Sequence, residues 1–321
     1  MSPDSHRDFF LCLNSSKMKK LTLFFLIISN CIASYAQEKS DQKLQLKLNE
    51  LVKGFNGDVG IYVKNLKTGK TASINADTIF PTASMIKVPI TCGVFNKIEK
   101  GELDYHAQLM YCDSLLYAGE DILGSFKDSE KISLSKVLML MITTSDNTAS
   151  LWAQLLAGTG TAINEVMANN GLKDTRVNSR TPGRKDNQKK YGWGQTTPKE
   201  MATLLALIRD GKMINPAASE RIYRNLIRIY WDSEALSQIP PTVQVASKSG
   251  AVDAARSEVC LVNAPHGDYV FCITTKNQQD ISWNYSNEGW TMIRKLSNLL
   301  WNHYEPNFGW KQPEGIQRYY K

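Results

Sequence analysis

Two side chains near the start of a predicted helix could work together as a nucleophile and its base. Ser84 and Lys87 stand three residues apart in the run Ser-Met-Ile-Lys, just after Pro81 and Thr82. On a helix this spacing puts both side chains on one face, so the lysine amine can reach the serine hydroxyl. Burial, a second nearby cation and the N–H groups of the helix start would favour proton transfer from Ser84 to Lys87. A serine three residues before a lysine also fits a solvated helix start, so the pair alone does not decide the function.

Two further polar motifs follow along the chain. Ser145, Asp146 and Asn147 lie between two predicted helices, and Lys248 and Ser249 lie at the end of a predicted strand. Asp146 or Asn147 could simply cap the second of those helices. Lys248 could be a charged residue that guards an edge strand. Neither motif identifies a site by itself.

The histidines do not favour a Ser-His-Asp triad. His6 lies in the predicted leader, while His106, His266 and His303 fall in a polar loop, a hairpin turn and a helix end. None stands beside an obvious nucleophile, and the G-x-S-x-G pattern of a nucleophile elbow is absent. If the chain is a hydrolase, we therefore expect its base not to be a histidine.

The elements that must position these residues are strands at both ends of the chain and helices between them. Thr197, Pro198 and Glu200 predict the start of one helix through a capping box. This order favours an α/β (α+β) fold, with one antiparallel sheet built from both termini, flanked by helices, and an inserted all-helical subdomain. The predicted strands cover residues 58–63, 71–74, 244–248, 258–262 and 269–275, and the predicted helices cover residues 44–52, 84–98, 134–144, 148–156, 163–170, 198–209, 216–227 and 289–303.

The three motifs together resemble those of the class A β-lactamase and penicillin-binding serine hydrolase family. They occur once each, in the family's order, and with separations that agree with it. The one departure within them is Ser249, where the family usually has threonine. The resemblance covers residues 58–303 and implies a β-lactamase/transpeptidase-like fold.

The resemblance implies a catalytic role for four residues. Ser84 would be the nucleophile that opens an amide or β-lactam carbonyl, and Lys87 would take its proton. Ser145 would pass a proton to the departing nitrogen. Lys248 would lie against Ser145 and lower its pKa.

It also implies four residues that bind substrate. Asn147 would hold the substrate amide and orient the catalytic lysine, and Ser249 would bind the substrate carboxylate. The backbone N–H of Ala251 would share the oxyanion hole with that of the nucleophile. Arg256 stands near the position of a carboxylate-binding arginine in many members, although it could equally be a surface residue of its strand.

The family's usual base for deacylation is missing from the sequence. Class A β-lactamases release the acyl group with a glutamate on a loop that precedes a Thr-Pro pair at a helix start. Counting back from that pair, Thr181 stands where the glutamate is expected, in a stretch rich in basic residues. Glu120 and Asp121 are the alternative candidates for this base.

Three functions follow from this pattern. The first is a serine hydrolase that acts on β-lactams through a Ser84 acyl-enzyme, as in antibiotic resistance, with deacylation made doubtful by Thr181. The second is a D-alanyl-D-alanine peptidase that reacts slowly with antibiotics. The third is a penicillin-binding or sensing domain without turnover. Completeness of the motifs favours an enzyme, but family membership alone does not define the natural substrate.

The start of the chain has the composition of an export signal. Met18 begins a basic stretch, residues 21–29 are apolar, and a small-x-small pattern predicts cleavage after Ala36. A lipid-carrying Cys31 is the less favoured alternative. We therefore expect an exported protein, periplasmic or secreted, whose true start is Met18. The predicted organisation is a signal peptide over residues 1–36, a serine hydrolase domain over 37–304 and a C-terminal tail over 305–321.

Composition favours a small-molecule substrate over a nucleic-acid or membrane partner. The formal net charge is +7, but the basic residues are scattered and form no stripe with aromatics. No stretch is long and apolar enough to span a bilayer. The sequence indicates no metal or organic cofactor, since the spacing of the cysteines fits no zinc site. For Cys92, Cys112, Cys260 and Cys272 we favour buried free thiols, although a disulfide between the last two depends on strand register.

Overall fold

The computed structural model describes residues 39–119, 121–227 and 229–316. Residues 40–321 form one compact unit. The predicted signal peptide, with its start at Met18, its cleavage site at Ala36 and the alternative at Cys31, lies outside the described residues. No helix in the part that the structure describes is long and apolar enough to cross a membrane.

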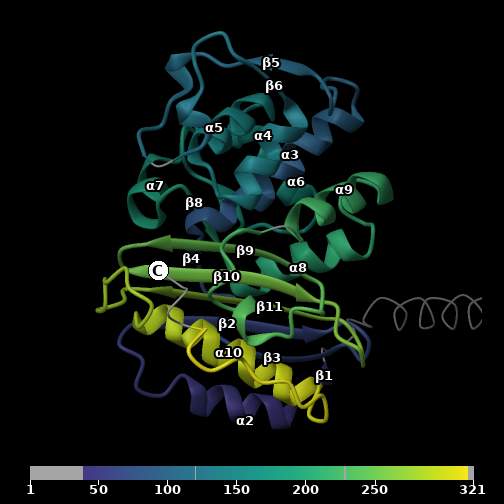
Figure 1. Ribbon diagram of the computed structural model, residues 1–321, viewed down its shortest axis with the longest axis vertical. Coiled ribbons are helices and arrows are strands. Elements are labelled where there is room, and N and C mark those ends of the chain that lie inside the picture. The colour runs from purple at the N-terminus through teal and green to yellow at the C-terminus, as the bar shows by residue number, and fades with distance from the viewer. Residues whose placement is uncertain (1–38, 120, 228, 317–321) are drawn as a thin grey trace, which may run out of the picture. The chain divides into compact units, whose positions relative to one another are not determined.

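The main sheet contains strands from both ends of the compact unit, as the sequence predicts. Its strands are β1 (Lys39–Ser40), β2 (Asp58–Asn65), β3 (Lys70–Ile74), β9 (Val245–Val252), β10 (Ala255–Val262) and β11 (Tyr269–Lys276). They lie in the order β1-β3-β2-β11-β10-β9, and the pairs from β3 to β9 are antiparallel. This order leaves β9, which carries Lys248, at the edge of the sheet (Figure 1).

Both faces of the sheet are buried, each in its own hydrophobic cluster. Side chains alternate along β10, so Val259 and Leu261 join one cluster while Cys260 and Val262 join the other. The first cluster lies between the sheet and the inserted helices, and the second lies between the sheet and the terminal helices. Successive side chains of β9 therefore point alternately toward the inserted helices and toward the terminal helices.

Two helices from opposite ends of the unit cover one face of the sheet (Figure 1). They are α2 (Gln42–Leu51) and α10 (Glu288–Tyr304). Asp41 caps α2 by accepting from the N–H of Leu44, and Asn287 caps α10. The tail continues along this side, where Phe308 packs edge-on against Trp301.

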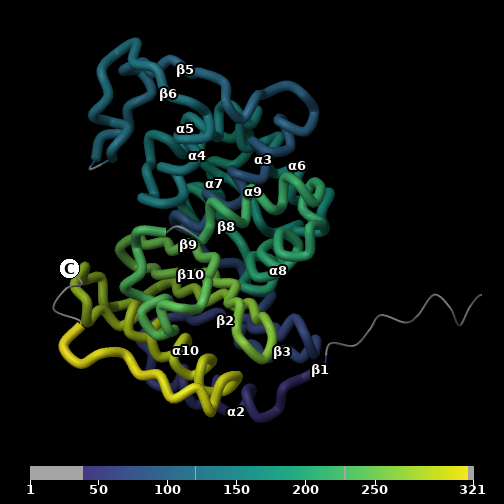
Figure 2. The backbone as a smooth tube through the Cα atoms, turned by 45° about the vertical axis from the view of Figure 1, so that its right-hand side comes forward, coloured from purple at the N-terminus to yellow at the C-terminus, as the bar shows by residue number. Residues whose placement is uncertain are grey.

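The other face carries the segment inserted between β3 and β9, which is mainly helical (Figures 1 and 2). Its 3₁₀ helices on this side are η1 (Ala83–Ile86), η2 (Asp113–Leu115) and η3 (Leu123–Ser125), whereas η4 (Leu236–Gln238), just before β9, packs on the side of α10. Its α-helices are α3 (Lys87–Glu99), α4 (Leu134–Thr143), α5 (Asn147–Leu156), α6 (Thr159–Asn169), α7 (Lys185–Tyr191), α8 (Pro198–Arg209) and α9 (Pro216–Leu226). Short strands form two small sheets, β4 (Phe80–Pro81) with β8 (Gly194–Thr196) and β7 (Arg176–Val177), and β5 (Gln108–Met110) with β6 (Lys131–Ser133).

The capping box predicted for α8 is only half formed. The hydroxyl of Thr197 accepts from the N–H of Glu200 at 3.2 Å, as expected. The carboxylate of Glu200 instead accepts from the N–H groups of Asp174 and Thr175 and from the Thr175 hydroxyl. The prediction of a reciprocal box is therefore wrong, because this carboxylate ties α8 to the segment that leads into β7.

The described cysteines are all free thiols. In the register of β10 and β11, Cys260 is opposite Phe271 and Cys272 is opposite Val259. The two thiols thus belong to different faces of the sheet. Cys92, Cys260 and Cys272 are buried as expected, but Cys112 is exposed, which corrects the prediction for that residue.

Candidate active site

The backbone around Ser84 is shaped to present its side chain beside Lys87. Strand β4 leads directly into η1, and Ala83 at the junction has a φ of +42°, a left-handed conformation that costs energy in a residue with a Cβ. A 3₁₀ helix has three residues per turn, so side chains three apart are aligned. Lys87 Nζ accordingly lies 3.2 Å from Ser84 Oγ.

The Lys87 amine is enclosed by acceptors from the motif at residues 145–147. Its Nζ is 2.5 Å from the carbonyl oxygen of Ser145, 3.0 Å from Ser145 Oγ and 2.8 Å from Asn147 Oδ1. The carbonyl and amide oxygens can only accept. A neutral amine that donates its two protons to them keeps a lone pair, which can accept the proton of the Ser84 hydroxyl.

Burial makes this neutral form accessible. Lys87 is fully buried, and burial lowers its pKa to about 7 against the opposing effects of Asp121 and Asp146. About half of the amine is therefore neutral near pH 7. Ser84 itself is only partly buried, so its hydroxyl remains open to a substrate.

The motif at residues 145–147 both caps a helix and contributes to the site. Asp146 caps α5 by accepting from the N–H of Ala149 at 2.7 Å and also accepts from the N–H of Leu123. Ser145 takes a left-handed φ of +62°, and it and Asn147 contact Lys87. The two interpretations of this motif therefore hold together, with Asp146 as the cap.

Lys248 is fully buried and lies within electrostatic reach of Lys87. Burial is the main cause that lowers its pKa well below the usual value, and the charge of Lys87 adds to the effect. Its Nζ donates to the carbonyl oxygen of Ser249 at 2.8 Å. Within the described chain it forms no hydrogen bond to Ser145, so the predicted contact between them stays a prediction.

The strand β9 approaches the nucleophile as closely as a glycine allows. A Cβ added to Gly250 would lie 2.6 Å from the carbonyl oxygen of Thr82 and 2.8 Å from the backbone nitrogen of Ser84. The Ser257 hydroxyl, on β10, also donates to the carbonyl oxygens of Thr82 and Gly250. This packing places the backbone next to Gly250, including Ala251, against the start of η1.

Ser84 opens into a cavity of about 540 Å³. Three of the predicted site residues line it, namely Ser84, Asn147 and Ala251. Ser249 does not line the cavity. Neighbouring side chains alternate along a strand, so Lys248 points toward the inserted helices and Ser249 points to the other face of the sheet. The lining is Pro81, Ala83, Ser84, Tyr117, Asn147, Lys190, Tyr191, Gly192, Trp193, Ala251, Val252, Ala254, Ala255, Lys276 and Asn277.

Sequence reasoning missed most of the cavity wall. Tyr117 and Trp193 form one side, with ring centroids 5.1 Å apart in an edge-on arrangement. Both lie in segments that have no apolar periodicity. Their only sign of a functional role in the sequence is that they are aromatic residues in otherwise polar loops. Lys190 and Lys276 gave no signal at all, because single lysines are common on any surface.

Arg256 has a structural environment that neither sequence interpretation predicts. The residue is fully buried, and its guanidinium lies 4.6 Å from the ring centroid of Trp283 and 4.4 Å from that of Trp290. It donates to the carbonyl oxygens of Val252, Asp253, Ala255 and Ser282. It is therefore neither a surface residue nor free to bind a substrate carboxylate. It instead holds the turn between β9 and β10, whose residues line the cavity.

The loop that should carry the deacylation base turns its side chain away from the cavity. Thr181 is buried, donates to the carbonyl oxygen of Ser179 and packs against Gly160, where an added Cβ would lie only 1.9 Å from its hydroxyl. Asp121 accepts from the N–H groups of Asn147 and Thr148 and so supports the start of α5. Glu120, the other candidate, lies outside the described residues.

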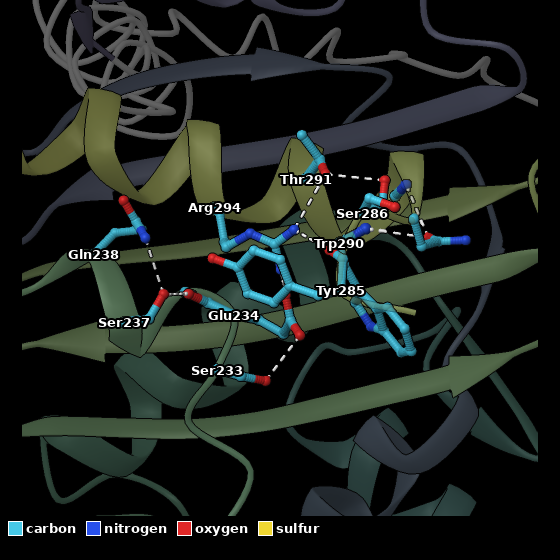
Figure 3. Close-up of polar contacts among 12 residues, drawn as sticks. Ser233, Glu234, Ser237, Gln238, Tyr285, Ser286, Trp290, Thr291 and Arg294 are labelled. Carbon is cyan, nitrogen blue, oxygen red and sulfur yellow. Dashed lines mark hydrogen bonds and ion pairs between the residues drawn. The ribbon is translucent and has the colours of Figure 1, made fainter. Parts of the chain in front are cut away.

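A second polar cluster supports β9 from the face opposite the nucleophile. Glu258 of β10 is fully buried and accepts from the Ser247 hydroxyl at 2.7 Å and from the N–H of Ala235. Burial raises its pKa to about 7. Beside it, Arg294 of α10 donates to Glu234 and stacks over the ring of Tyr285 (Figure 3). This cluster anchors the segment before β9 to α10.

Comparison with known proteins agrees with this geometry. A family model described as the β-lactamase enzyme family matches residues 43–304. The chain is 25% identical to β-lactamase VEB-1 of Pseudomonas aeruginosa, in an alignment that covers 88% of this chain and 95% of that protein.

Solved structures show the same architecture. PBP-A has a TM-score of 0.73 at 25% identity, and a mutant of PBP-A determined as an acyl-enzyme complex with penicillin G has 0.74; each comparison covers 84% of this chain and 98% of the other. A class A β-lactamase representative from Bacteroides cellulosilyticus has a TM-score of 0.72 at 20% identity, over 83% of this chain and 98% of that one.

Proposed function

The chain belongs to the β-lactamase enzyme family, and on that premise we propose that it forms a covalent acyl-enzyme on Ser84 with β-lactams. The observation that carries the proposal is the placement of Ser84 Oγ beside a buried amine whose other contacts include two pure acceptors. A serine hydroxyl next to a neutral amine is an activated nucleophile.

The proposed acylation transfers one proton at each stage. Lys87 takes the proton of Ser84 as Oγ attacks the carbonyl carbon of the lactam. The N–H groups of Ser84 and Ala251 stabilise the negative charge on the carbonyl oxygen, and removal of one such donor typically costs about 100 to 1,000-fold in rate. As the C–N bond breaks, Ser145 passes its proton to the departing nitrogen and recovers one from Lys87. The ring-opened acyl group then remains attached to Ser84 as an ester.

Release of this ester is proposed to be slow. Hydrolysis needs a base to activate water, and none of the residues that line the described cavity is an aspartate, glutamate or histidine. We therefore favour acylation that is faster than deacylation. The role of a D-alanyl-D-alanine peptidase or of a penicillin-binding sensor is the second candidate, and the similarity to a protein named PBP-A supports it.

Export is a further part of the proposal. The composition of residues 1–36 supports a periplasmic or secreted protein, with the lipid anchor at Cys31 as the less favoured form. Cell-wall peptides and β-lactams are both met outside the cytoplasm, which agrees with the proposed chemistry.

Labelling with a fluorescent penicillin tests the proposed nucleophile. Wild-type protein should become labelled, and Ser84→Ala should not, while its circular dichroism spectrum and melting temperature stay close to those of wild type. Ser179→Ala, which also removes a serine hydroxyl but lies outside the cavity, serves as the control and should label normally. Labelling of Ser84→Ala at the wild-type rate would assign the nucleophile elsewhere.

A further inference from the structure

The cavity that opens at Ser84 extends to one side of the oxyanion site. Ala251 lines it together with the turn residues that follow, Val252, Ala254 and Ala255, whereas Lys248 and Ser249 do not. The proposed mechanism assigns Ser145 to the departing nitrogen, and the family resemblance implies that Lys248 lies against Ser145. Since β9 advances about 3.3 Å per residue, the part beyond Ala251 lies away from the leaving group. It therefore faces the acyl portion, which stays on Ser84.

Two lysines outside the proposed catalytic machinery line this part of the cavity. Lys190 lies near the end of α7, with its Nζ 5.1 Å from the ring centroid of Tyr191. Lys276 ends β11, where its Nζ donates to the carbonyl oxygen of Ile79 at 3.0 Å and lies over the ring of Phe80. These partners are an aromatic ring for Lys190 and a ring with a carbonyl oxygen for Lys276, so neither contact neutralises the ammonium charge.

No carboxylate lines the described cavity. Of the nearby acids, Asp58 lies opposite Lys276 in the register of β2 and β11 and accepts from the side-chain amide of Asn277 at 2.7 Å, while Asp253 accepts from the indole of Trp283. Neither acid lines the cavity. Two cations face a cavity whose remaining lining is neutral.

From this arrangement we propose that the two lysines of the cavity lining, Lys190 and Lys276, provide a subsite for a carboxylate on the acyl side chain of the substrate. The inference rests on the proposed function, because it assumes that an acyl group is attached to Ser84. It adds the class of substrate, an acyl donor with a negatively charged side chain. Tyr117 and Trp193 would pack against the apolar part of that side chain.

A charge series of penicillins tests this subsite. The probes are three penicillins with a phenylacetyl side chain that carries a para carboxylate, a para carboxamide or a para aminomethyl group. The measured quantity is the second-order rate of adduct formation on wild-type protein by intact mass. We expect the carboxylate to react about fivefold faster than the carboxamide at low salt, and the aminomethyl compound to react slowest. At high salt the differences should shrink, because surface charges are screened.

Variants assign the effect to the two lysines. Lys190→Gln should reduce the preference for the carboxylate over the carboxamide, and Lys190→Gln with Lys276→Gln should abolish it. Lys189→Gln, which removes the neighbouring charge of α7 outside the cavity lining, is the control and should keep the preference. A melting curve for each variant checks the fold, and Lys190→Gln alone, at an exposed position, keeps the test valid if the double variant does not fold.

The outcomes separate this inference from the proposed function. Equal rates for the three probes on wild type, or a preference that survives the double substitution, would overturn the subsite while acylation of Ser84 still stood. The complete lack of an adduct with every probe would instead contradict the proposed function, and the subsite with it.

Discussion

At the scale of single residues, the surroundings of Lys87 give it the protonation state that its proposed role needs. Burial lowers its pKa to about 7, and its contacts with the Ser145 carbonyl and Asn147 Oδ1 use the two donors of a neutral amine. Its partner Ser84 is 3.2 Å away. The sequence could predict this pair from spacing alone, but not the protonation state, which depends on residues about 60 positions later in the chain.

The pKa of Lys87 predicts the pH dependence of acylation. The active form is the neutral amine, which is lost as pH falls below about 7. The rate of adduct formation with a penicillin should therefore fall about tenfold per pH unit below this value and level off above it. Lys97→Met, which removes a half-buried lysine paired with Glu102 outside the cavity lining, should keep the same profile. Lys87→Met should lower the rate by several orders of magnitude, and a flat profile for wild type would contradict the role of Lys87.

Thr181 allows a second prediction at this scale. Its side chain is buried against Gly160, so a glutamate at this position would place a carboxylate in the protein interior and not in the cavity. Thr181→Glu should destabilise the fold by more than about 2 kcal/mol and leave the lifetime of the acyl adduct unchanged. Thr181→Val, of similar shape, is the matched control for denaturant unfolding. A much shorter adduct lifetime in the glutamate variant would show that the loop can turn this side chain toward the acyl group.

At the scale of elements, the packing of β9 against η1 determines the geometry of the oxyanion site. Gly250 allows this packing, because any Cβ there would meet backbone atoms of Thr82 and Ser84. Arg256 holds the turn that follows β9 through three of its carbonyl oxygens, and it also donates to the carbonyl oxygen of Ser282 in the segment before α10. The proposed catalytic residues of the two elements are therefore held by contacts between residues that are far apart in the sequence.

Gly250→Ala tests this packing. The added methyl should push β9 away from η1 and lower the acylation rate by about 100 to 1,000-fold, the usual effect of losing one oxyanion donor. Gly119→Ala is the matched control, since a Cβ there meets no atom within 4 Å. The measurement is adduct formation by mass spectrometry at equal protein concentration. An unchanged rate in Gly250→Ala would mean that the close approach does not serve catalysis.

The sequence predicted most of the long elements and missed the short ones for a physical reason. Helices such as α5 and α8 have apolar periodicity and capping residues, and both lie within a residue of their predicted bounds. The helix α7 has no buried residue, so no apolar pattern marks it. The strand pairs of β4, β7 and β8 are too short for alternation to be visible. These missed elements include part of the cavity wall.

At the scale of the whole molecule, the sheet separates two clusters of different function. The face toward the inserted helices carries Lys248 and Gly250 beside Ser84, and the opposite face carries Glu258 with its partners. The sequence predicted one antiparallel sheet built from strands at both ends of the chain, but not the order of those strands. It could not predict to which face Arg256 points, because a shift of one residue in register reverses every side chain of a strand.

Glu258 predicts how stability responds to pH. Its pKa is about 7 in the fold and near 4.5 in the unfolded chain, so the contribution of this group is fully present below pH 4.5 and is lost as pH rises through 7. The difference in melting temperature between Glu258→Gln and wild type should therefore shift in favour of the variant between pH 4.5 and 7. Glu220→Gln, at an exposed helix position, should show no such shift. A constant difference for Glu258→Gln would contradict the raised pKa.

One measurement tests the central claim, that the protein forms a Ser84 acyl-enzyme faster than it releases it. Wild-type protein is mixed with excess benzylpenicillin, and intact mass is followed from milliseconds to hours, with peptide mapping of the adduct. We predict one stoichiometric adduct on the peptide that contains Ser84, formed quickly and persisting long after free penicillin is removed. An adduct on another residue, or continuous hydrolysis of penicillin with no adduct accumulating, would contradict the claim.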